Sequence, residues 1–207
     1  MPHYPLHAPY LYSLSKKHGE HVNPGGSSSA AEAIALSTHV GTHIDALCHF
    51  SSHGKLHGGA DSSAFQSYAN GMEQLSVDTI QPIFRRGVLL DIARLLGVDV
   101  LPVDFVIAAT TIQPGDVVLL RTGWSRYRND PARFEIEAAR WLRARKIFAA
   151  GSETAPFEAV PSPEMPVHMH LLVESGIDII ECLNLEELLT SGGTASPIRP
   201  VALVAND

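Results

Sequence analysis

The segment from His39 to Phe50 constrains the fold of this chain more than any other. Its candidate metal ligands all have odd numbers: His39, His43, Asp45 and His49. Its even-numbered positions are mostly apolar: Val40, Thr42, Ile44, Ala46, Cys48 and Phe50. An extended backbone points alternate side chains to opposite faces, so the pattern predicts one face of imidazole and carboxylate groups and one face that packs on a core.

A straight strand would hold His39 and His43 too far apart for one metal ion. At ~3.3 Å per residue their backbones would be ~13 Å apart, whereas metal–nitrogen bonds are only ~2 Å long. A bend at Gly41, which can adopt a positive φ, would bring the two imidazoles together. A helical turn would do the same, but Asp45 would then point elsewhere. We therefore expect a strand that bends into a loop.

The composition describes an acidic globular chain. Its 207 residues, 45% hydrophobic and 18% charged, favour one folded domain and argue against disorder. The net charge of -7 disfavours nucleic acid as a partner, because phosphate contacts need clustered Lys and Arg. We expect no signal peptide and no membrane association, since no apolar run approaches the ~18 residues of a membrane helix. Only two cysteines are present, which favours a cytoplasmic protein.

The chain divides into an N-terminal arm and one domain. Prolines and the run from Asn23 to Ser29 break any periodicity, so we expect residues 1–34 to form an irregular arm. An alternative to a purely exposed loop is that this arm crosses to a partner subunit and helps close its active site. Residues 35–207 alternate apolar runs with helical patterns, which predicts a mixed α/β or α+β domain with a mixed β-sheet flanked by helices. Strands are expected at 88–92, 117–120, 146–151, 177–181 and 201–204, and helices at 103–111, 130–142, 166–173 and 184–189.

The histidines and the aspartate of this segment favour a metal site over simple packing. A lone histidine on an apolar face is usually a core residue, but His39, His43 and Asp45 lie close together in the sequence and His49 follows them. Nitrogen and carboxylate donors together suit Zn²⁺ or Mn²⁺, and no paired cysteines of a structural zinc site are present.

The run His39-x-Gly41-Thr42-His43-x-Asp45-x-x-x-His49-Phe50 resembles the signature of the metal-dependent cyclase-type hydrolases. That family contains bacterial kynurenine formamidases and isatin hydrolases. The similarity covers the chain from about Ala35 to Leu189, with further matches at 87–91, 114–124, 166–168 and 179–181. The resemblance implies a swivelling β/α-type fold, one or two divalent ions per chain, a small-molecule substrate, and a homodimer or higher homo-oligomer.

The resemblance also implies the ligands. Three residues match the ligands of the first metal: His39, His43 and Asp45. In two-metal members of the family, Asp45 would bridge to a second ion held by a downstream histidine and glutamate. Glu181 matches that glutamate. The Pro-Val-His context points to His168 as the histidine, with His170 as the alternative.

This chain departs from the family pattern at two positions. Leu47 stands where the family usually has proline, and Glu153 stands where a Gly-x-Asp-Thr pattern would have aspartate. Neither departure removes a ligand, and both leave the substrate open.

The resemblance matches His49 to the catalytic acid/base. A divalent metal lowers the pKa of bound water toward ~7, and His49, with an ordinary pKa near ~6.5, can take a proton from that water and return it to a leaving nitrogen. The expected reaction is amide hydrolysis, and the family implies an aryl formamide such as N-formylkynurenine as substrate. The alternatives are hydrolysis of another cyclic amide or lactone, as in isatin, and a non-catalytic metal or small-molecule binding protein.

Aromatic residues near these motifs are candidates for stacking on the substrate. Phe50 adjoins the predicted catalytic histidine, and Trp124 and Tyr127 fall just past a predicted strand end, where loops often line pockets. Simple packing is an equally good interpretation of Trp124 and Tyr127.

Overall fold

The computed structural model describes residues 7–92, 111–124, 135–158 and 160–186. The chain forms two compact units, Met1–Gly41 and Thr42–Asp207, and each is described separately.

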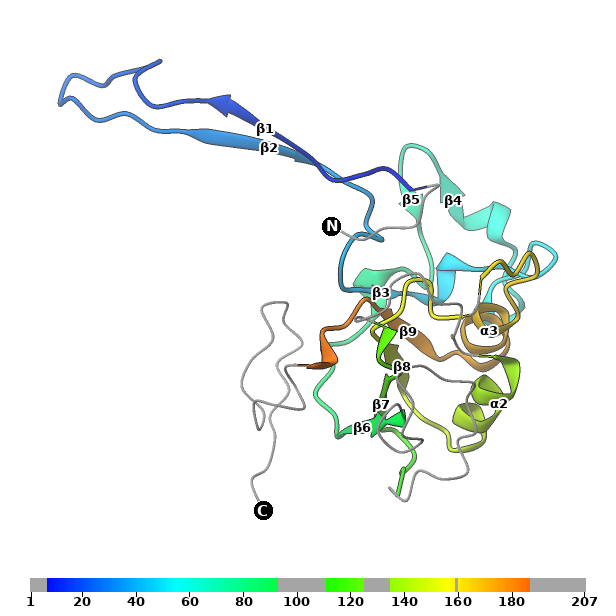
Figure 1. The fold of residues 1–207 in the computed structure, drawn as a ribbon. Coiled ribbons are helices and arrows are strands. Elements are labelled where there is room, and N and C mark those ends of the chain that lie inside the picture. Colours follow the sequence, from blue (N-terminus) through cyan, green and yellow to red (C-terminus); the bar gives the residue numbers. More distant parts are fainter. Residues whose placement is uncertain (1–6, 93–110, 125–134, 159, 187–207) are drawn as a thin grey trace. The chain divides into compact units, whose positions relative to one another are not determined.

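The first unit is a two-stranded antiparallel ribbon (Figure 1). It pairs β1 (Leu11–Lys16) with β2 (Ala31–Ala35), and Tyr12 lies opposite Ile34. This differs from the irregular arm expected from the sequence. Apolar and polar residues alternate here, since a serine separates Tyr12 from Leu14, and such alternation is the pattern of a strand. The prolines and glycines outside the strands made this short pattern hard to recognise in the sequence.

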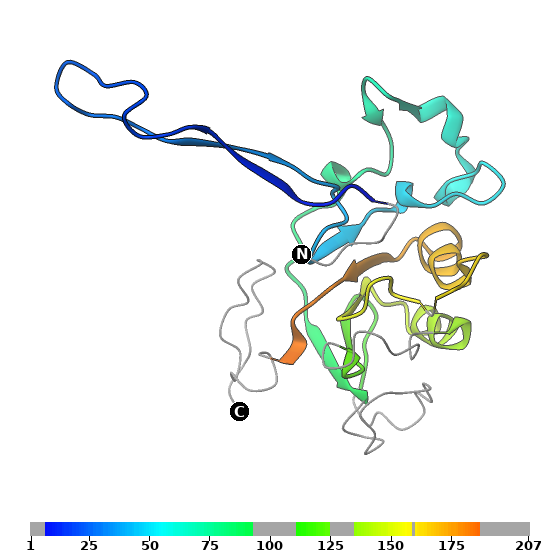
Figure 2. The same cartoon turned by 45° about the horizontal axis from the view of Figure 1, so that its top comes forward.

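The second unit contains the predicted mixed sheet, in the order β3-β9-β8-β7-β6. The strands are β3 (His43–Asp45), β6 (Gly87–Asp91), β7 (Val117–Arg121), β8 (Ala149–Ser152) and β9 (Asp178–Glu181). Strands β6 to β9 are parallel, whereas β3 is antiparallel to β9, beside which it lies in Figure 2. Parallel strands are covered on both faces and therefore have nearly continuous apolar runs, which is why the sequence predicted four of them.

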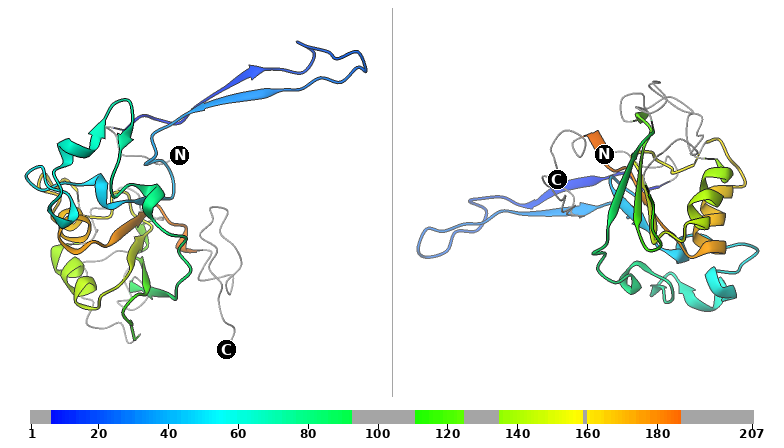
Figure 3. Two further views of the ribbon diagram at one scale, coloured as in Figure 1. Left: turned by 180° about the vertical axis from the view of Figure 1, so that it is seen from behind. Right: turned by 90° about the horizontal axis from the view of Figure 1, so that it is seen from below.

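Helices cover one face of this sheet (Figure 3, right). They are α2 (Ile136–Ala144) and α3 (Pro166–His168), which continues into a π-helix at Met169–Ser175. Gly176, at φ 65, ends the π-helix in the left-handed conformation, as predicted. The buried residues of α2 join the main core with Leu171, Ile179 and the inner side chains of β6 and β7.

Short elements complete the second unit. They are 3₁₀ turns at Leu47–His49, His57–Gly59, Ser62–Phe65 and Val77–Thr79, and a small hairpin of β4 (Gln66–Ser67) and β5 (Gly71–Met72). The predicted helix at 103–111, the predicted strand at 201–204 and the predicted helix start at Asp130 lie outside the described residues. Of the predicted helix at 184–189, Leu185 and Glu186 are helical and the residues after them lie outside. In the described part of the chain, no helix is long and apolar enough to cross a membrane.

Candidate metal centre

The pairing of β3 with β9 assembles the centre. His43 lies directly opposite Glu181, and Asp45 lies opposite Ile179. Opposite residues of an antiparallel pair share a face, as do residues two apart, so His43, Asp45 and Glu181 project from the same face of the sheet. Ile179 belongs to the main core, which places these polar side chains on the face that the helices cover.

The backbone bends where the sequence predicted. Gly41 has a φ of 68, and the strand begins only at His43. His39 precedes this bend and belongs to the first unit, so its role as a ligand stays a prediction from the sequence spacing. After Asp45 the strand gives way to the 3₁₀ turn Leu47–His49, so the extended alternation is shorter than expected.

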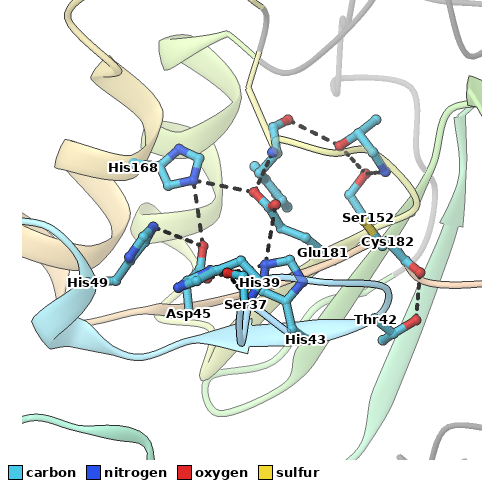
Figure 4. Close-up of polar contacts among 12 residues, drawn as sticks. Ser37, His39, Thr42, His43, Asp45, His49, Ser152, His168, Glu181 and Cys182 are labelled. Atoms are coloured by element: carbon cyan, nitrogen blue, oxygen red, sulfur yellow. Dashed lines mark hydrogen bonds and ion pairs between the residues drawn. The ribbon is translucent and has the colours of Figure 1, made fainter. Parts of the chain in front are cut away.

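The carboxylates of Asp45 and Glu181 each lie within 3.7 Å of the Nε2 atoms of both His43 and His168 (Figure 4). Asp45 Oδ1 lies 3.4 Å from His43 Nε2, and Asp45 Oδ2 lies 3.7 Å from His168 Nε2. Glu181 Oε2 lies 3.6 Å from His43 Nε2, and Glu181 Oε1 lies 3.3 Å from His168 Nε2. Two donor atoms bound ~2.1 Å from one tetrahedral zinc ion would be ~3.4 Å apart, so these separations are those of ligands around a shared cation.

The structure places His168 in the centre. It comes from α3, and its ring nitrogen, one oxygen of Asp45 and one of Glu181 lie within 4.8 Å of one another. His170 lies on the π-helix, and its Nδ1 is 2.7 Å from Glu174 Oε2. Of the two histidines that the sequence left open, it is His168 that the structure brings to Asp45 and Glu181.

A third carboxylate, that of Glu158, contacts the ring nitrogen of His168 that Asp45 and Glu181 do not contact. Its Oε1 is 2.6 Å from His168 Nδ1, and its side chain is almost fully buried. Sequence reasoning missed Glu158, because it lies in a proline-rich loop without a motif. Phe157 was also missed: its backbone N–H donates to Glu181 Oε1 at 2.6 Å.

The electrostatics of the centre fit a divalent cation. Burial lowers the pKa of His168, but its interactions with the carboxylates of Asp45, Glu158 and Glu181 outweigh burial and raise that pKa well above the ordinary value. The three carboxylates near His168, those of Asp45, Glu158 and Glu181, are 1%, 1% and 5% exposed, and imidazoles that bind a metal are neutral and do not balance their charge. Buried charges are costly unless they are paired or coordinate a metal. The donor set therefore fits a divalent ion in both charge and spacing.

His49 also lies close to Asp45 and is more exposed to solvent than His168. Its Nε2 lies 3.9 Å from Asp45 Oδ2, and its side chain is 26% exposed, whereas that of His168 is 2% exposed. In a straight strand the side chains of Asp45 and His49 would be far apart, so the 3₁₀ turn at Leu47–His49 is what lets them meet.

The two described aromatic candidates differ in their surroundings. The Phe50 ring lies 5.1 Å from the His49 ring and 4.9 Å from the His168 ring, so Phe50 borders the centre. Trp124 is only 7% exposed, which leaves little of its ring for a substrate, and its role in binding stays a prediction. Tyr127 lies outside the described residues.

The structure shows the contacts of both residues that depart from the family pattern. Glu153 Oε1 accepts hydrogen bonds from Thr122 N, Thr122 Oγ1 and Trp124 N, at 2.8, 2.9 and 2.8 Å. Glu153 thus anchors the turn that follows β7. Leu47 packs against the main core. Neither residue is among those that meet Asp45 or Glu181 in the contacts above.

Comparison with known proteins identifies the family. The model of the family described as "Putative cyclase" matches residues 1–159. The chain belongs to this cyclase family. The matched region contains the motif from His39 to His49 but ends before His168 and Glu181, which the fold brings to it. No curated protein sequence matches the chain.

Solved structures share the cyclase-family fold. The crystal structure of a novel cyclase is 25% identical, with a TM-score of 0.80, over 92% of this chain and 72% of that chain. Isatin hydrolase A from Ralstonia solanacearum is 25% identical, with a TM-score of 0.57, over 87% of this chain and 72% of that chain. A potential metal-dependent hydrolase with cyclase activity is 22% identical, with a TM-score of 0.56, over 91% and 82%, and shows a likeness of fold.

Proposed function

We propose that this chain is a metal-dependent hydrolase that cleaves the amide bond of an aryl formamide. The observation that carries the proposal is the arrangement in which Asp45 and Glu181 each span His43 and His168, with His49 beside them. Buried carboxylates and imidazoles at ligand spacing serve to hold a cation, and a further, more exposed histidine serves to move protons.

The residues that would hold metal divide into two sets. His43 and Asp45 would hold a first ion, with His39 added from the sequence motif. Asp45, His168 and Glu181 would hold a second. Zn²⁺ and Mn²⁺ suit such mixed nitrogen and carboxylate donors, so we propose one or two of these ions per chain. A bound divalent ion would supply a water of lowered pKa and would polarise a carbonyl group.

The chain's own groups handle the protons and orient the site. His49 would take the proton that water loses and deliver it to the leaving nitrogen. In this hydrolysis the water oxygen bonds to the formyl carbon and the carbon–nitrogen bond breaks, which releases formate and an aryl amine. Asp45, 3.9 Å from His49 Nε2, would favour the imidazolium that exists between the two transfers. The Phe157 N–H holds Glu181 in place.

The proposed substrate is N-formylkynurenine, which would place the reaction in tryptophan catabolism. The Phe50 ring, beside both His49 and His168, offers an aromatic surface next to the proposed reacting groups. A second candidate is the opening of a cyclic amide such as isatin, because isatin hydrolase A is among the solved structures of similar fold. A related candidate is a lactone.

An activity screen separates these candidates. Chelator-treated protein, reconstituted with Zn²⁺ or Mn²⁺, is assayed with N-formylkynurenine, isatin and a simple lactone. We expect hydrolysis of the formamide with the highest kcat/KM, and activity that is lost on chelation and regained with metal. Rapid isatin opening without formamide turnover would reassign the substrate. Stoichiometric metal binding without turnover of any compound would favour a non-catalytic binding protein.

We also propose that the ribbon of the first unit pairs two copies of this chain. Tyr12, Leu14 and Ile34 lie on one face of the ribbon and are 56%, 51% and 57% exposed. A two-stranded ribbon is marginally stable alone in water, and clustered exposed apolar side chains mark interaction sites. A second copy of the same ribbon is self-complementary and would cover this face in a homodimer or higher homo-oligomer.

Light scattering after size-exclusion chromatography tests this pairing. The wild-type protein should have at least twice the chain mass of 22.3 kDa, and the double variant Tyr12→Ser, Ile34→Ser should have the mass of one chain. The double variant Tyr68→Ser, Phe84→Ser, which changes exposed apolar residues of the second unit, is the control and should keep the wild-type mass. A single-chain mass for the wild type would contradict the proposal.

A further inference from the structure

We propose that Glu158 is a positioning residue for the metal centre, because its carboxylate sets the tautomer and the orientation of His168. This inference rests on the proposed metal-dependent function. It assigns a role to a residue that lies outside the signature motif and that the ligand set does not include.

Glu158 binds both the ring and the backbone of His168. Its Oε1 lies 2.6 Å from His168 Nδ1 and accepts the His168 backbone N–H at 2.9 Å. Its Oε2 accepts the backbone N–H of Val167 at 3.4 Å. The first backbone N–H groups of a helix have no partner within the helix, so this carboxylate satisfies the start of α3 and the imidazole together. His168 is therefore fixed relative to its own helix.

The contacts of the two ring nitrogens differ in length. The Nδ1 contact of 2.6 Å has the length of a strong, charge-assisted hydrogen bond. The contacts of Nε2, at 3.7 Å to Asp45 and 3.3 Å to Glu181, are longer than an ordinary N–H···O hydrogen bond. In the neutral ring that binds a metal, the proton is therefore best placed on Nδ1, where it is donated to Glu158. The lone pair of Nε2 then faces the space that Nε2 shares with Asp45 and Glu181.

This arrangement is the one that a histidine ligand requires. A neutral imidazole binds metal through its unprotonated nitrogen, and a carboxylate on the other N–H fixes that tautomer and makes the ligand nitrogen more basic. Glu158 and His168 are 1% and 2% exposed, so water does not replace the carboxylate readily. Removal of such a partner typically weakens metal affinity by ~10- to 100-fold.

The chain contains a matched control pair. His170 Nδ1 lies 2.7 Å from Glu174 Oε2, which is the same type of contact at nearly the same length. The Glu174 side chain is 57% exposed, and His170 does not belong to the group formed by Asp45, His168 and Glu181. Loss of the Glu174 carboxylate therefore tests the general effect of removing a carboxylate from a histidine of the same helix.

Metal affinity is measured with Zn²⁺ alone, in competition with a chromophoric chelator, without substrate. We expect Glu158→Gln to weaken Zn²⁺ binding by ~10- to 100-fold, and Glu174→Gln to change it by less than about twofold. Circular dichroism of each metal-free variant checks that it is folded. Wild-type affinity in a folded Glu158→Gln protein would overturn the inference while leaving the metal site intact. Failure of the wild-type protein to bind Zn²⁺ would instead refute the proposed function.

A measurement on the wild-type chain keeps the inference testable if Glu158→Gln does not fold. Nitrogen chemical shifts of ¹⁵N-labelled histidine distinguish the two tautomers, and the signal of His168 is assigned by its absence in His168→Gln. We expect Nδ1 of His168 to carry a proton in both the metal-free and the Zn²⁺-loaded protein. Loss of the proton from Nδ1 in either state would overturn the inference, because Glu158 would then not determine the tautomer.

Discussion

Asp45→Asn is expected to remove bound metal and to lower kcat/KM by about a thousandfold or more, which corresponds to ~4 kcal/mol of transition-state stabilisation. Asp45 lies within 3.9 Å of three histidine nitrogens, those of His43, His49 and His168. Asparagine removes the negative charge and replaces one acceptor oxygen with an NH₂ group, which cannot bind a cation. Elemental analysis and steady-state kinetics of the same preparation measure both effects.

Asp178→Asn is the matched control for this substitution. Asp178 is also a buried aspartate of the sheet, and burial, followed by the charge of Asp45, raises its pKa to about 6. Because side chains alternate along a strand, Asp178 and Glu181 of β9 point to opposite faces. The control should keep the wild-type metal content and kcat/KM. Wild-type metal content and kinetics in Asp45→Asn would refute the assigned centre.

His49→Ala is expected to lower kcat by about a hundredfold to ten-thousandfold, the usual contribution of a general acid or base, while metal stays bound. The physical reason is that His49 contacts Asp45 from the open side of the centre, whereas the buried His168 faces Asp45 and Glu181 together. Methyl replaces the only group assigned to proton transfer and leaves the carboxylates in place. The measurement is kcat at saturating substrate together with metal content.

His53→Ala provides the control for His49→Ala. His53 lies in the loop that follows and is exposed, so its loss should leave both kcat and metal content unchanged. If His49→Ala lost its metal, His49 would have to be reassigned as a ligand. If it kept both metal and the wild-type kcat, the proton transfer would have to be assigned to another group.

The parts of the fold that the sequence predicted well are those with a local pattern. Strands β6 to β9 were expected because buried parallel strands have contiguous apolar residues, and the end of the π-helix was expected because Gly176 tolerates a positive φ. The ribbon of β1 and β2 was missed. Its alternation is short, and the prolines and the Asn23–Ser29 run around it are the stronger signal.

Sequence alone determined the features of the site that depend on neighbouring residues. The spacing of His39, His43, Asp45 and His49 predicted metal binding, the family resemblance matched His49 to the catalytic acid/base, and Gly41 indicated the bend, because ligand spacing and backbone freedom are local properties. The tertiary structure decided what depends on strand register and on contacts between segments distant in the chain. The β3–β9 pairing places Glu181 opposite His43, and the packing of α3 brings His168 to Asp45 and Glu181, because no local pattern specifies which distant side chains will meet.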